Sequence, residues 1–407
     1  MASTAIHKLG HQKSPGLSTE AIGAVVVGGD YQGLGIVRSL GRRNIPICVV
    51  DDEYSIARFS KYTTHTARRP SLRDEKQTAE ALLEIGQQLD LKGWVLYPTR
   101  DETVAALSHY RAALAAFFRV PTPEWTTIRW AWNKWNTYRL AEEIGIPTPR
   151  TWSSDSVDRL RSLDITFPVA IKPAVKEHFF YATKAKAWRA DNQAQLEDLF
   201  ARAAKQVGRS DEVIIQELIP GDGLQQFAYC GFFKDGGSVA SIIVRRTRQH
   251  PPEFGRASTF AETTDLPILQ ELSERFLSAI GYYGLVELEY KYDRRDGRYK
   301  LLDVNARTWG YHTLGYRAGV DFPYLLFADQ LGMPVERKVG QPGVSWVRLV
   351  TDLPTGMAEI LAGRLKCGSY LRSLRNASVE AVFSREDPLP GMVELMLIPY
   401  LFVRRGF

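Results

Sequence analysis

The stretch of sequence that decides the fold is Gly284–Arg307, which reads GLVELEYKYDRRDGRYKLLDVNAR. Its two halves are rich in valine, leucine and tyrosine and are separated by a polar turn, so they predict two strands joined as a β-hairpin. Because side chains alternate between the two faces of a strand, the second strand should carry Leu302 on one face and polar side chains on the other. That polar row consists of Asp303, Asn305 and Arg307.

The polar row predicts a site for a cation and an anion. Glu287 and Glu289 share one face of the first strand, and in a paired hairpin at least one of them lies across from Asp303 and Asn305. Carboxylate and amide oxygens so close together are costly unless a cation lies between them, and such ligands suit Mg²⁺ bound to phosphate. Arg307 can hold a phosphoryl oxygen or a developing negative charge. The alternative is an ordinary solvated acidic face.

Size and composition are typical of a globular protein with more than one domain. The chain has 407 residues, is 44% hydrophobic and carries a formal net charge of +6. The basic residues are scattered, which argues against a nucleic-acid partner but suits a small anionic ligand. The three cysteines lie far apart, which fits a reducing cytoplasm, and no stretch is apolar enough to span a bilayer.

The N-terminal part predicts a strand–helix–strand unit. Residues 1–20 are polar and predict a disordered tail, not a signal peptide. Strands are expected at Ala21–Val27 and Ile45–Val50, with a helix at Ile36–Arg43 between them. An acid follows the second strand, as in a dinucleotide site, but the glycine spacing does not match that motif. An NAD(P)-dependent oxidoreductase is therefore only an alternative interpretation.

A second candidate anion site lies at the end of the strand predicted at Gly93–Pro98. The helix predicted at Thr103–Tyr110 follows it, with Thr99 or Asp101 as its N-cap. A helix that begins at the carboxyl end of a parallel strand offers backbone N–H groups to an anion or a substrate.

Two lysines occupy positions that favour an anionic ligand. Lys134 begins an amphipathic helix that Gly145 and Pro147 terminate. Lys172 is the one charged residue of the apolar strand Phe167–Pro173, and a buried lysine is costly unless it meets an anion.

A further strand, a hairpin and an arginine cluster follow. Val213–Ile219 is apolar, and Phe227–Phe233 is expected to pair with the next strand across a short turn. Three arginines then crowd together before a proline-rich loop, and we expect them to bind the substrate carboxylate: Arg245, Arg246 and Arg248.

The order of these motifs resembles the ATP-grasp superfamily of carboxylate–amine ligases, in particular the carbamoyl phosphate synthase and biotin carboxylase group that includes D-aspartate ligase. Each motif is weak alone, and the five in order are specific. The resemblance covers about Ile22–Met333 and rests on Lys134 before a helix ending in Gly-Ile-Pro-Thr-Pro, on Phe-Pro-Val-Ala-Ile-Lys172-Pro, on Gln216-Glu217-Leu-Ile219-Pro-Gly, on Glu287, and on Leu-Asp303-Val-Asn305-Ala-Arg307.

The resemblance implies a fold and a set of roles. The fold is α/β and α+β: a Rossmann-like domain without a dinucleotide at 21–121, a two-lobed ATP-grasp domain at 122–333, and a small C-terminal region at 334–407. The implied ATP-binding residues are Lys134, Lys172, Gln216, Glu217 and Ile219. The implied Mg²⁺ ligands are Glu287, Asp303 and Asn305, and Arg307 is the implied catalytic residue on the reacting phosphoryl group.

The sequence departs from the family pattern at three points. Asp303 stands where glutamate is usual. The segment after Lys172 lacks a glycine run, so Lys184 and the main chain are expected to cover the phosphates. Asp222 is the candidate for the ribose hydroxyls.

The implied reaction is ATP-dependent activation of a carboxylate as an acyl phosphate, followed by attack of an amine, with Mg²⁺ or alternatively Mn²⁺ as the metal. Carbamoyl phosphate synthase-like carboxyphosphate chemistry and a nucleotide-binding sensor without turnover are the alternatives. The apolar C-terminal tail after Gly391 is expected to pack on the protein or to join a homodimer, with peripheral membrane contact as the alternative.

Overall fold

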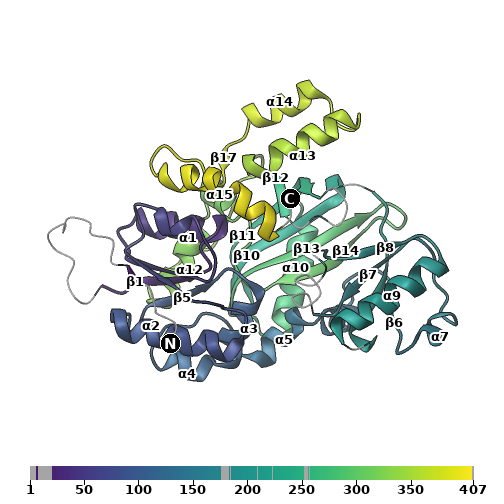
Figure 1. The fold of residues 1–407 in the computed structure, drawn as a ribbon, viewed down its shortest axis with the longest axis horizontal. Helices are drawn as coiled ribbons and strands as arrows, with labels where there is room; N and C mark the ends of the chain where they lie inside the picture. Colours follow the sequence, from purple (N-terminus) through teal and green to yellow (C-terminus); the bar gives the residue numbers. More distant parts are fainter. Residues whose placement is uncertain are drawn as a thin grey trace.

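The computed structural model describes residues 6–7, 21–175, 183, 185–208, 210–221, 223–251, 255 and 257–405. These residues form three β-sheets of five, four and eight strands. In Figure 1 the five-stranded sheet lies at the left, the four-stranded sheet at the lower right, and the eight-stranded sheet between them, with the C-terminal helices at the top. The architecture confirms the expected α/β and α+β fold.

The N-terminal domain is built on a parallel sheet. Its strand β2 (Ala24–Val27) pairs in parallel with β3 (Ile47–Asp51) and with β5 (Val95–Pro98), and β3 pairs in parallel with β4 (His65–Arg68). All four residues of β2 are buried, as expected for a parallel strand with helices on both faces. The helical segments are α1 (Tyr31–Gly41), η1 (Ala57–Phe59), α2 (Glu75–Leu89), α3 (Asp101–His109) and α4 (Arg111–Ala115).

Two local features of this domain differ from what the sequence predicted for those residues. β1 (Ile6–His7), from the expected disordered tail, pairs antiparallel with β4, whose outer edge offers free backbone groups. Helix α1 begins at Tyr31 instead of Ile36 because the side chain of Asp30 caps it, accepting a hydrogen bond from the backbone N–H of Gln32 at 3.0 Å.

The small lobe of the second domain is a four-stranded sheet in the order β6-β9-β7-β8. The pairs β6–β9, β7–β8 and β7–β9 are all antiparallel. Two helices precede it, α5 (Trp125–Trp132) and α6 (Lys134–Glu143). Its elements are β6 (Thr151–Ser153), α7 (Val157–Leu160), β7 (Val169–Pro173), β8 (Trp188–Ala190), α9 (Gln193–Val207), η2 (Ser210–Glu212) and β9 (Val213–Glu217).

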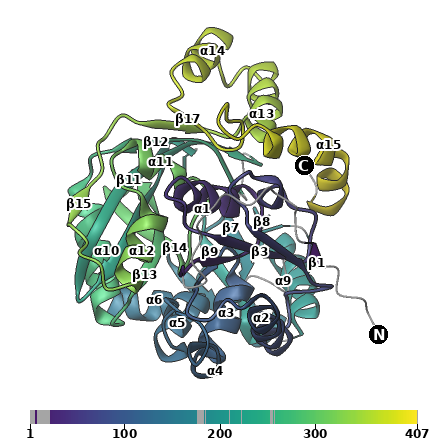
Figure 2. The ribbon, with the colours of Figure 1, turned by 90° about the vertical axis from the view of Figure 1, so that its left-hand side faces the viewer.

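The large lobe is the eight-stranded sheet, in which β14, β13, β10, β11 and β12 are neighbours in that order. Figure 2 shows this sheet beside the N-terminal domain. Its elements are η3 (Gly223–Gln225), β10 (Gln226–Lys234), β11 (Gly237–His250), β12 (Ala257–Thr264), α10 (Pro267–Ala279), β13 (Gly284–Asp293), β14 (Arg298–Asn305), α11 (Thr313–Arg317) and α12 (Phe322–Gln330).

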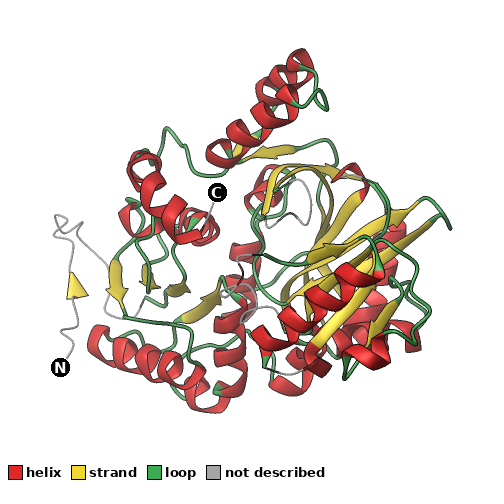
Figure 3. Ribbon diagram, turned by 45° about the vertical axis from the view of Figure 1, so that its right-hand side comes forward, coloured by secondary structure: helices red, strands yellow, loops and turns green. Residues whose placement is uncertain are grey.

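The C-terminal region extends the large lobe. β15 (Lys338–Val339) pairs with β11, β16 (Ser345–Val347) pairs with β12, and β17 (Val379–Glu380) pairs with β16. The expected boundary near residue 333 therefore does not separate two sheets. The helices of this region are α13 (Leu349–Leu361), α14 (Cys367–Arg375) and α15 (Leu389–Arg405). α13 and α14 project at the top of the molecule, as the ribbon in Figure 3 also shows, whereas α15 lies against the N-terminal domain (Figure 1). Within the residues described, no helix is long and apolar enough to cross a membrane.

A buried ion pair fastens the C-terminal region to the N-terminal domain. The carboxylate of Asp387 accepts hydrogen bonds from Arg38 Nε at 3.0 Å, Ser60 Oγ at 2.8 Å and the backbone N–H of Lys61 at 2.9 Å. Both charged side chains are almost fully buried. A buried charge is tolerable only when it is paired and hydrogen-bonded, so each partner depends on the other.

We predict that Asp387→Ala lowers the free energy of unfolding by about 3–5 kcal/mol, because Arg38 would stay buried without a counter-charge. Chemical denaturation monitored by circular dichroism measures the change. The neighbouring Glu386→Ala is the control, since its ion pair with Arg42 lies at the surface and should contribute no more than about 1 kcal/mol. Equal effects of the two substitutions would contradict the prediction.

Candidate active site

The register of the β13–β14 hairpin brings the polar row together. Glu287 lies opposite Asn305, and Glu289 lies opposite Asp303, so all four side chains share one face. A β-bulge follows, because Tyr290 pairs with Leu301 and leaves the intervening Leu302 without a partner. The bulge corrects the expectation for Leu302, which lines a large cleft instead of facing away from it.

Glu287 and Asn305, which are buried, form a hydrogen-bonded cluster with the half-buried Glu289. Asn305 Nδ2 donates to Glu287 Oε2 and to Glu289 Oε1, both at 3.1 Å, and the hydroxyl of Tyr311 donates to Glu287 Oε1. Glu287 is only 5% exposed. Burial, together with the negative charge of Glu289, raises the pKa of Glu287 to about 7. A carboxylate in this position would gain from a bound cation.

Two arginines flank this cluster, Arg246, which is buried, and Arg307, which is half-buried. Arg246 donates to Glu289 Oε2 and, through Nε, to Ser258 Oγ at 2.7 Å. Arg307 donates from Nε to Asp101 Oδ1 at 2.7 Å and from Nη2 to Asp101 Oδ2 at 3.1 Å. Burial works against the charged form of Arg307, but the carboxylate of Asp101 keeps its pKa above the ordinary value. Both arginines therefore stay charged.

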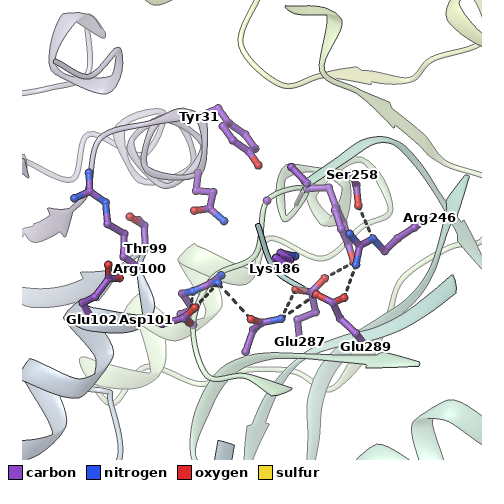
Figure 4. A pocket seen from close by; sticks show the side chains of 16 residues that line it. Tyr31, Thr99, Arg100, Asp101, Glu102, Lys186, Arg246, Ser258, Glu287 and Glu289 are labelled. Atoms are coloured by element: carbon purple, nitrogen blue, oxygen red, sulfur yellow. Dashed lines mark hydrogen bonds and ion pairs between the residues drawn. The ribbon is translucent and has the colours of Figure 1, made fainter. Parts of the chain in front are cut away.

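These groups line a polar cavity of about 250 Å³ between the N-terminal domain and the large lobe. Figure 4 shows acids and cations facing one another across it. The second domain contributes Lys186, Arg246, Glu287, Glu289, Asn305 and Arg307. The N-terminal domain contributes Tyr31, Gln32, Thr99, Arg100, Asp101 and Glu102.

The N-terminal contribution comes from the strand end that the sequence predicted as an anion site. The predicted N-cap was wrong, because Arg100 holds the cap position of α3 without a side-chain cap bond. Thr99 instead donates to the backbone oxygen of Val27 at 3.0 Å, and Asp101 binds Arg307. Both side chains thus link structural elements instead of capping the helix.

A larger cleft of about 1220 Å³ lies between the two lobes. Lys172 reaches it from the end of β7, and its Nζ donates to Tyr138 Oη at 2.6 Å and to Gln216 Oε1 at 2.7 Å. Burial lowers the pKa of Lys172. Tyr138 in turn donates to the backbone oxygen of Leu302 at 2.7 Å, so one hydroxyl connects Lys172 to the bulge.

The predicted segment between the lobes also borders this cleft: Gln216, Glu217 and Ile219. The carboxylate of Glu217 is already engaged by the backbone N–H of Arg150 at 2.9 Å, by Lys300 at 3.0 Å and by Arg295 at 2.9 Å. The implied role of Glu217 in ATP binding stays a prediction, and its carboxylate already has three partners in this structure. Predicted residues Asp222 and Lys184 lie outside the described part of the chain.

The predicted metal-ligand trio of Glu287, Asp303 and Asn305 stays a prediction. In the structure Lys134 Nζ forms an ion pair with Asp303 Oδ1, whereas Asn305 is hydrogen-bonded to Glu287 and Glu289. Within the described residues, no group of three or more His, Cys, Asp or Glu side chains is arranged to hold a metal ion. The side chains that converge are Glu287, Glu289 and Asn305, with the amide nitrogen of Asn305 donating to both carboxylates and its oxygen accepting from Arg307 at 3.3 Å. The two carboxylates are ligands that suit Mg²⁺, which takes few protein ligands and completes its shell with water or phosphate oxygens.

The three clustered arginines do not form one anion clamp. Arg246 faces the polar cavity, but Arg245 is part-exposed and pairs with Glu262 at 3.5 Å. Arg248 is bound at 2.8 Å by each carboxylate oxygen of Asp352 and borders the larger cleft. Side chains alternate along β11 and the strand carries bulges after Arg246, so neighbours in sequence point apart.

Several residues of the site escaped the sequence analysis. Tyr138 follows Lys134 by one helical turn, a spacing that would have indicated a shared helix face. Tyr311 gave no local signal. Arg100 bonds to Asp51 at 2.7 Å and to Asp52 at 2.5 Å, so the acids of the dinucleotide alternative are already paired. That pairing argues against an NAD(P) site.

Comparisons with known proteins bear on the fold and on the class of enzyme. A family described as "ATP-grasp in the biosynthetic pathway with Ter operon" matches residues 232–352. The chain is 23% identical to the D-aspartate ligase of Enterococcus faecium (strain Aus0004) over 299 residues, which is 70% of each protein.

Two solved structures share the fold. The biotin carboxylase domain of Hydrogenobacter thermophilus 2-oxoglutarate carboxylase superposes with a TM-score of 0.62 and 16% identity, covering 80% of this chain and 74% of that one. The L-amino acid ligase from Bacillus licheniformis gives a TM-score of 0.58 with 17% identity, covering 77% and 75%.

The fold is that of two-lobed ATP-grasp structures, with a Rossmann-like domain before the two lobes. Residues 232–352 match an ATP-grasp family, and the curated relative and the shared fold support the same class of protein. An ATP-dependent ligase is the class of enzyme that these relatives support.

The raised pKa of Glu287 gives a testable pH dependence. Between the ordinary value of 4.5 and about 7, the folded protein holds a proton that the unfolded chain releases. The stabilising effect of this proton is complete below pH 4.5 and is lost as the pH rises through 7. We predict that, in metal-free buffer, Glu287→Gln flattens this fall in stability by on the order of a few kcal/mol. Urea denaturation from pH 5 to 8 measures it.

The exposed Glu336→Gln substitution is the control for the pH series, because its side chain lies at the surface. It should reproduce the wild-type slope. If Glu287→Gln also reproduced that slope, the carboxyl group of Glu287 would not be holding a proton in the folded protein.

Proposed function

We propose that the protein is an ADP-forming carboxylate–amine ligase that binds ATP in the cleft between the lobes and its carboxylate substrate in the polar cavity. One observation carries the proposal: strand β14 runs from one space to the other. Leu302 lines the cleft, whereas Asn305 and, just past the strand end, Arg307 line the cavity. A phosphoryl group held along this strand would lie between nucleotide and substrate.

The substrate class follows from the cavity. Its volume of about 250 Å³ suits a small molecule, and its walls carry both acids and cations. We therefore infer a small polar carboxylate, including zwitterionic ones, with Arg246 as the candidate partner of the substrate carboxylate. The N-terminal side chains Tyr31, Gln32 and Arg100 would contact the remainder of the substrate.

The proposed reaction has two steps. A substrate carboxylate oxygen attacks the γ-phosphorus of ATP, the bond from that phosphorus to the β-phosphate oxygen breaks, and ADP leaves. The amine then attacks the acyl carbon, loses a proton, and displaces inorganic phosphate as the carbon–oxygen bond breaks. Such chemistry depends mainly on alignment and charge neutralisation.

Residues of this chain would supply both the alignment of the reactants and the neutralisation of charge. Lys172 and Lys134 would hold phosphates, the backbone at Gln216–Ile219 would meet the adenine, and Arg307 would stabilise the transferring group. Glu287, Glu289 and Asn305 would hold Mg²⁺, which when bound neutralises phosphate charge. Asp303 would join this set only if its ion pair with Lys134 opened.

A screen for ADP and phosphate release over small carboxylates and amines, with and without Mg²⁺, tests the proposal. With ¹⁸O in the substrate carboxylate, an acyl phosphate requires one labelled oxygen to appear in the released phosphate. Turnover that depends on bicarbonate alone would favour carboxyphosphate chemistry. ATP binding without turnover on any pair would favour a sensor.

We predict that Lys172→Ala weakens ATP binding about 10- to 100-fold, because a hydrogen bond to a charged group contributes roughly 1.5–3 kcal/mol. Isothermal titration calorimetry with a non-hydrolysable ATP analogue and Mg²⁺ measures it. Lys92→Ala, at an exposed position of the N-terminal domain, is the control. Affinity within twofold of wild type would remove Lys172 from the nucleotide site.

We predict that Arg307→Met lowers turnover on the order of 10³-fold while ATP–Mg²⁺ affinity changes little, because its contact strengthens as charge moves onto the transferring group. Equilibrium binding and single-turnover ADP formation on the same variant separate the two effects. Arg298→Met, exposed on the same strand, is the matched control. Near-normal turnover, or loss of ATP binding in a folded variant, would overturn this role.

A further inference from the structure

Helices α13 and α14, with the linker between them, form a projecting helical hairpin. This C-terminal hairpin spans Leu349–Arg375, and the ribbon views show it at the top, directed away from the sheets (Figures 1, 2 and 3). Its base is anchored by the ion pair of Asp352 with Arg248 on β11.

The outer face of the hairpin is apolar. Leu353, Met357 and Leu361 follow one another at four-residue spacing on α13, and they are 44%, 60% and 87% exposed. Leu371 on α14 is 59% exposed. Single exposed apolar residues are common, but an apolar row that ends at the tip of a projecting hairpin is typical of an interaction surface.

The same hairpin is basic. Lys366, Arg372 and Arg375 are exposed, and among the described residues they take part in no ion pair. The hairpin contains two acids, and each is neutralised: Asp352 by Arg248, and Glu359 by Arg364. The outer surface therefore carries a net positive charge beside its apolar row.

A second copy of the chain is a poor partner for this surface. In a two-fold symmetric dimer the same patch meets itself, which would bring like charges of the two copies together. An anionic lipid surface suits both properties, because apolar tips enter the interface while lysine and arginine contact the headgroups. We propose that the C-terminal hairpin docks the protein on an anionic phospholipid membrane without crossing it.

The inner side of the hairpin forms part of the wall of the large cleft, so docking of the hairpin on a membrane would also affect that cleft. Thr355, Glu359, Arg364 and Leu365 border the large cleft that also contains Lys172. A membrane that holds the outer face would therefore also hold one wall of this cleft. The docking itself does not depend on the ligase proposal, and its test needs no turnover.

Vesicle binding of the full chain is the experiment. Cys367 is the exposed cysteine at the start of α14, whereas Cys48 and Cys230 are buried, so an environment-sensitive dye can be attached at the hairpin. We expect a blue shift and co-sedimentation with phosphatidylcholine–phosphatidylserine vesicles, weaker binding to phosphatidylcholine alone, and weakening by salt.

Two sets of substitutions separate charge from apolar contact. Changing Lys366, Arg372 and Arg375 together to Gln should reduce partitioning to anionic vesicles on the order of 100-fold, at about fivefold per cation. Leu361→Ser with Leu371→Ser should abolish the blue shift. The matched control replaces the exposed pair Arg294 and Arg298, in the β13–β14 turn region, by Gln and should bind as wild type.

Each contrary result decides against the proposal. Wild-type protein that binds no vesicle, or binds neutral and anionic vesicles alike, would overturn it. So would anionic binding that both hairpin variants retain. Light scattering measures whether the protein is a dimer. If it is a dimer and Leu361→Ser dissociates it, the hairpin surface is an interface between two copies of the chain and the membrane proposal is wrong. All these side chains are exposed, so the variants should keep the wild-type melting temperature.

Discussion

The pairing of β13 with β14 is the constraint on which the site depends. Its register places Glu287 opposite Asn305 and Glu289 opposite Asp303, and it thereby collects negative charge on one buried face. That charge is balanced by cations from other elements, Arg246 from β11 and Lys134 from α6. A shift of one residue in the hairpin would turn all these groups to the opposite face.

The N-terminal domain, the large lobe and the C-terminal region each supply counter-ions for charged side chains of another part. Arg307 lies just past β14, but its counter-ion Asp101 comes from the N-terminal domain. Arg248 belongs to the large lobe, but Asp352 comes from the C-terminal region. Each cation is buried or half-buried beside its acid, so these ion pairs fix the contacts between the three parts of the chain. They also keep the walls of the polar cavity charged.

Local pattern in the sequence was enough to predict the strands, the hairpin and the order of motifs, because alternation and turn residues act over short distances. It also singled out Lys172, Asn305 and Arg307, which line the cleft and the cavity in the structure. It failed at three points: the bulge at Leu302, the pairing of Asp303 with Lys134, and the divergence of Arg245 from Arg246. The ion pair of Asp303 depends on Lys134, which is distant in sequence, and the bulge depends on the exact register of the hairpin, so local pattern encodes neither. The divergence of Arg245 from Arg246 follows from the alternation of side chains along a strand, which the prediction of one arginine cluster overlooked.

The attachment of β16 to β12 has a consequence for how the chain can be divided. Residues 260–262 of β12 form their outer pairs with β16, which lies beyond residue 333, the expected end of the ATP-grasp domain. A chain that ended near residue 333 would leave the backbone of β12 without this neighbour. An open sheet edge offers hydrogen bonds to any other strand, so such a fragment would tend to associate with itself and precipitate. By covering this edge, the last strands help to keep the large lobe soluble.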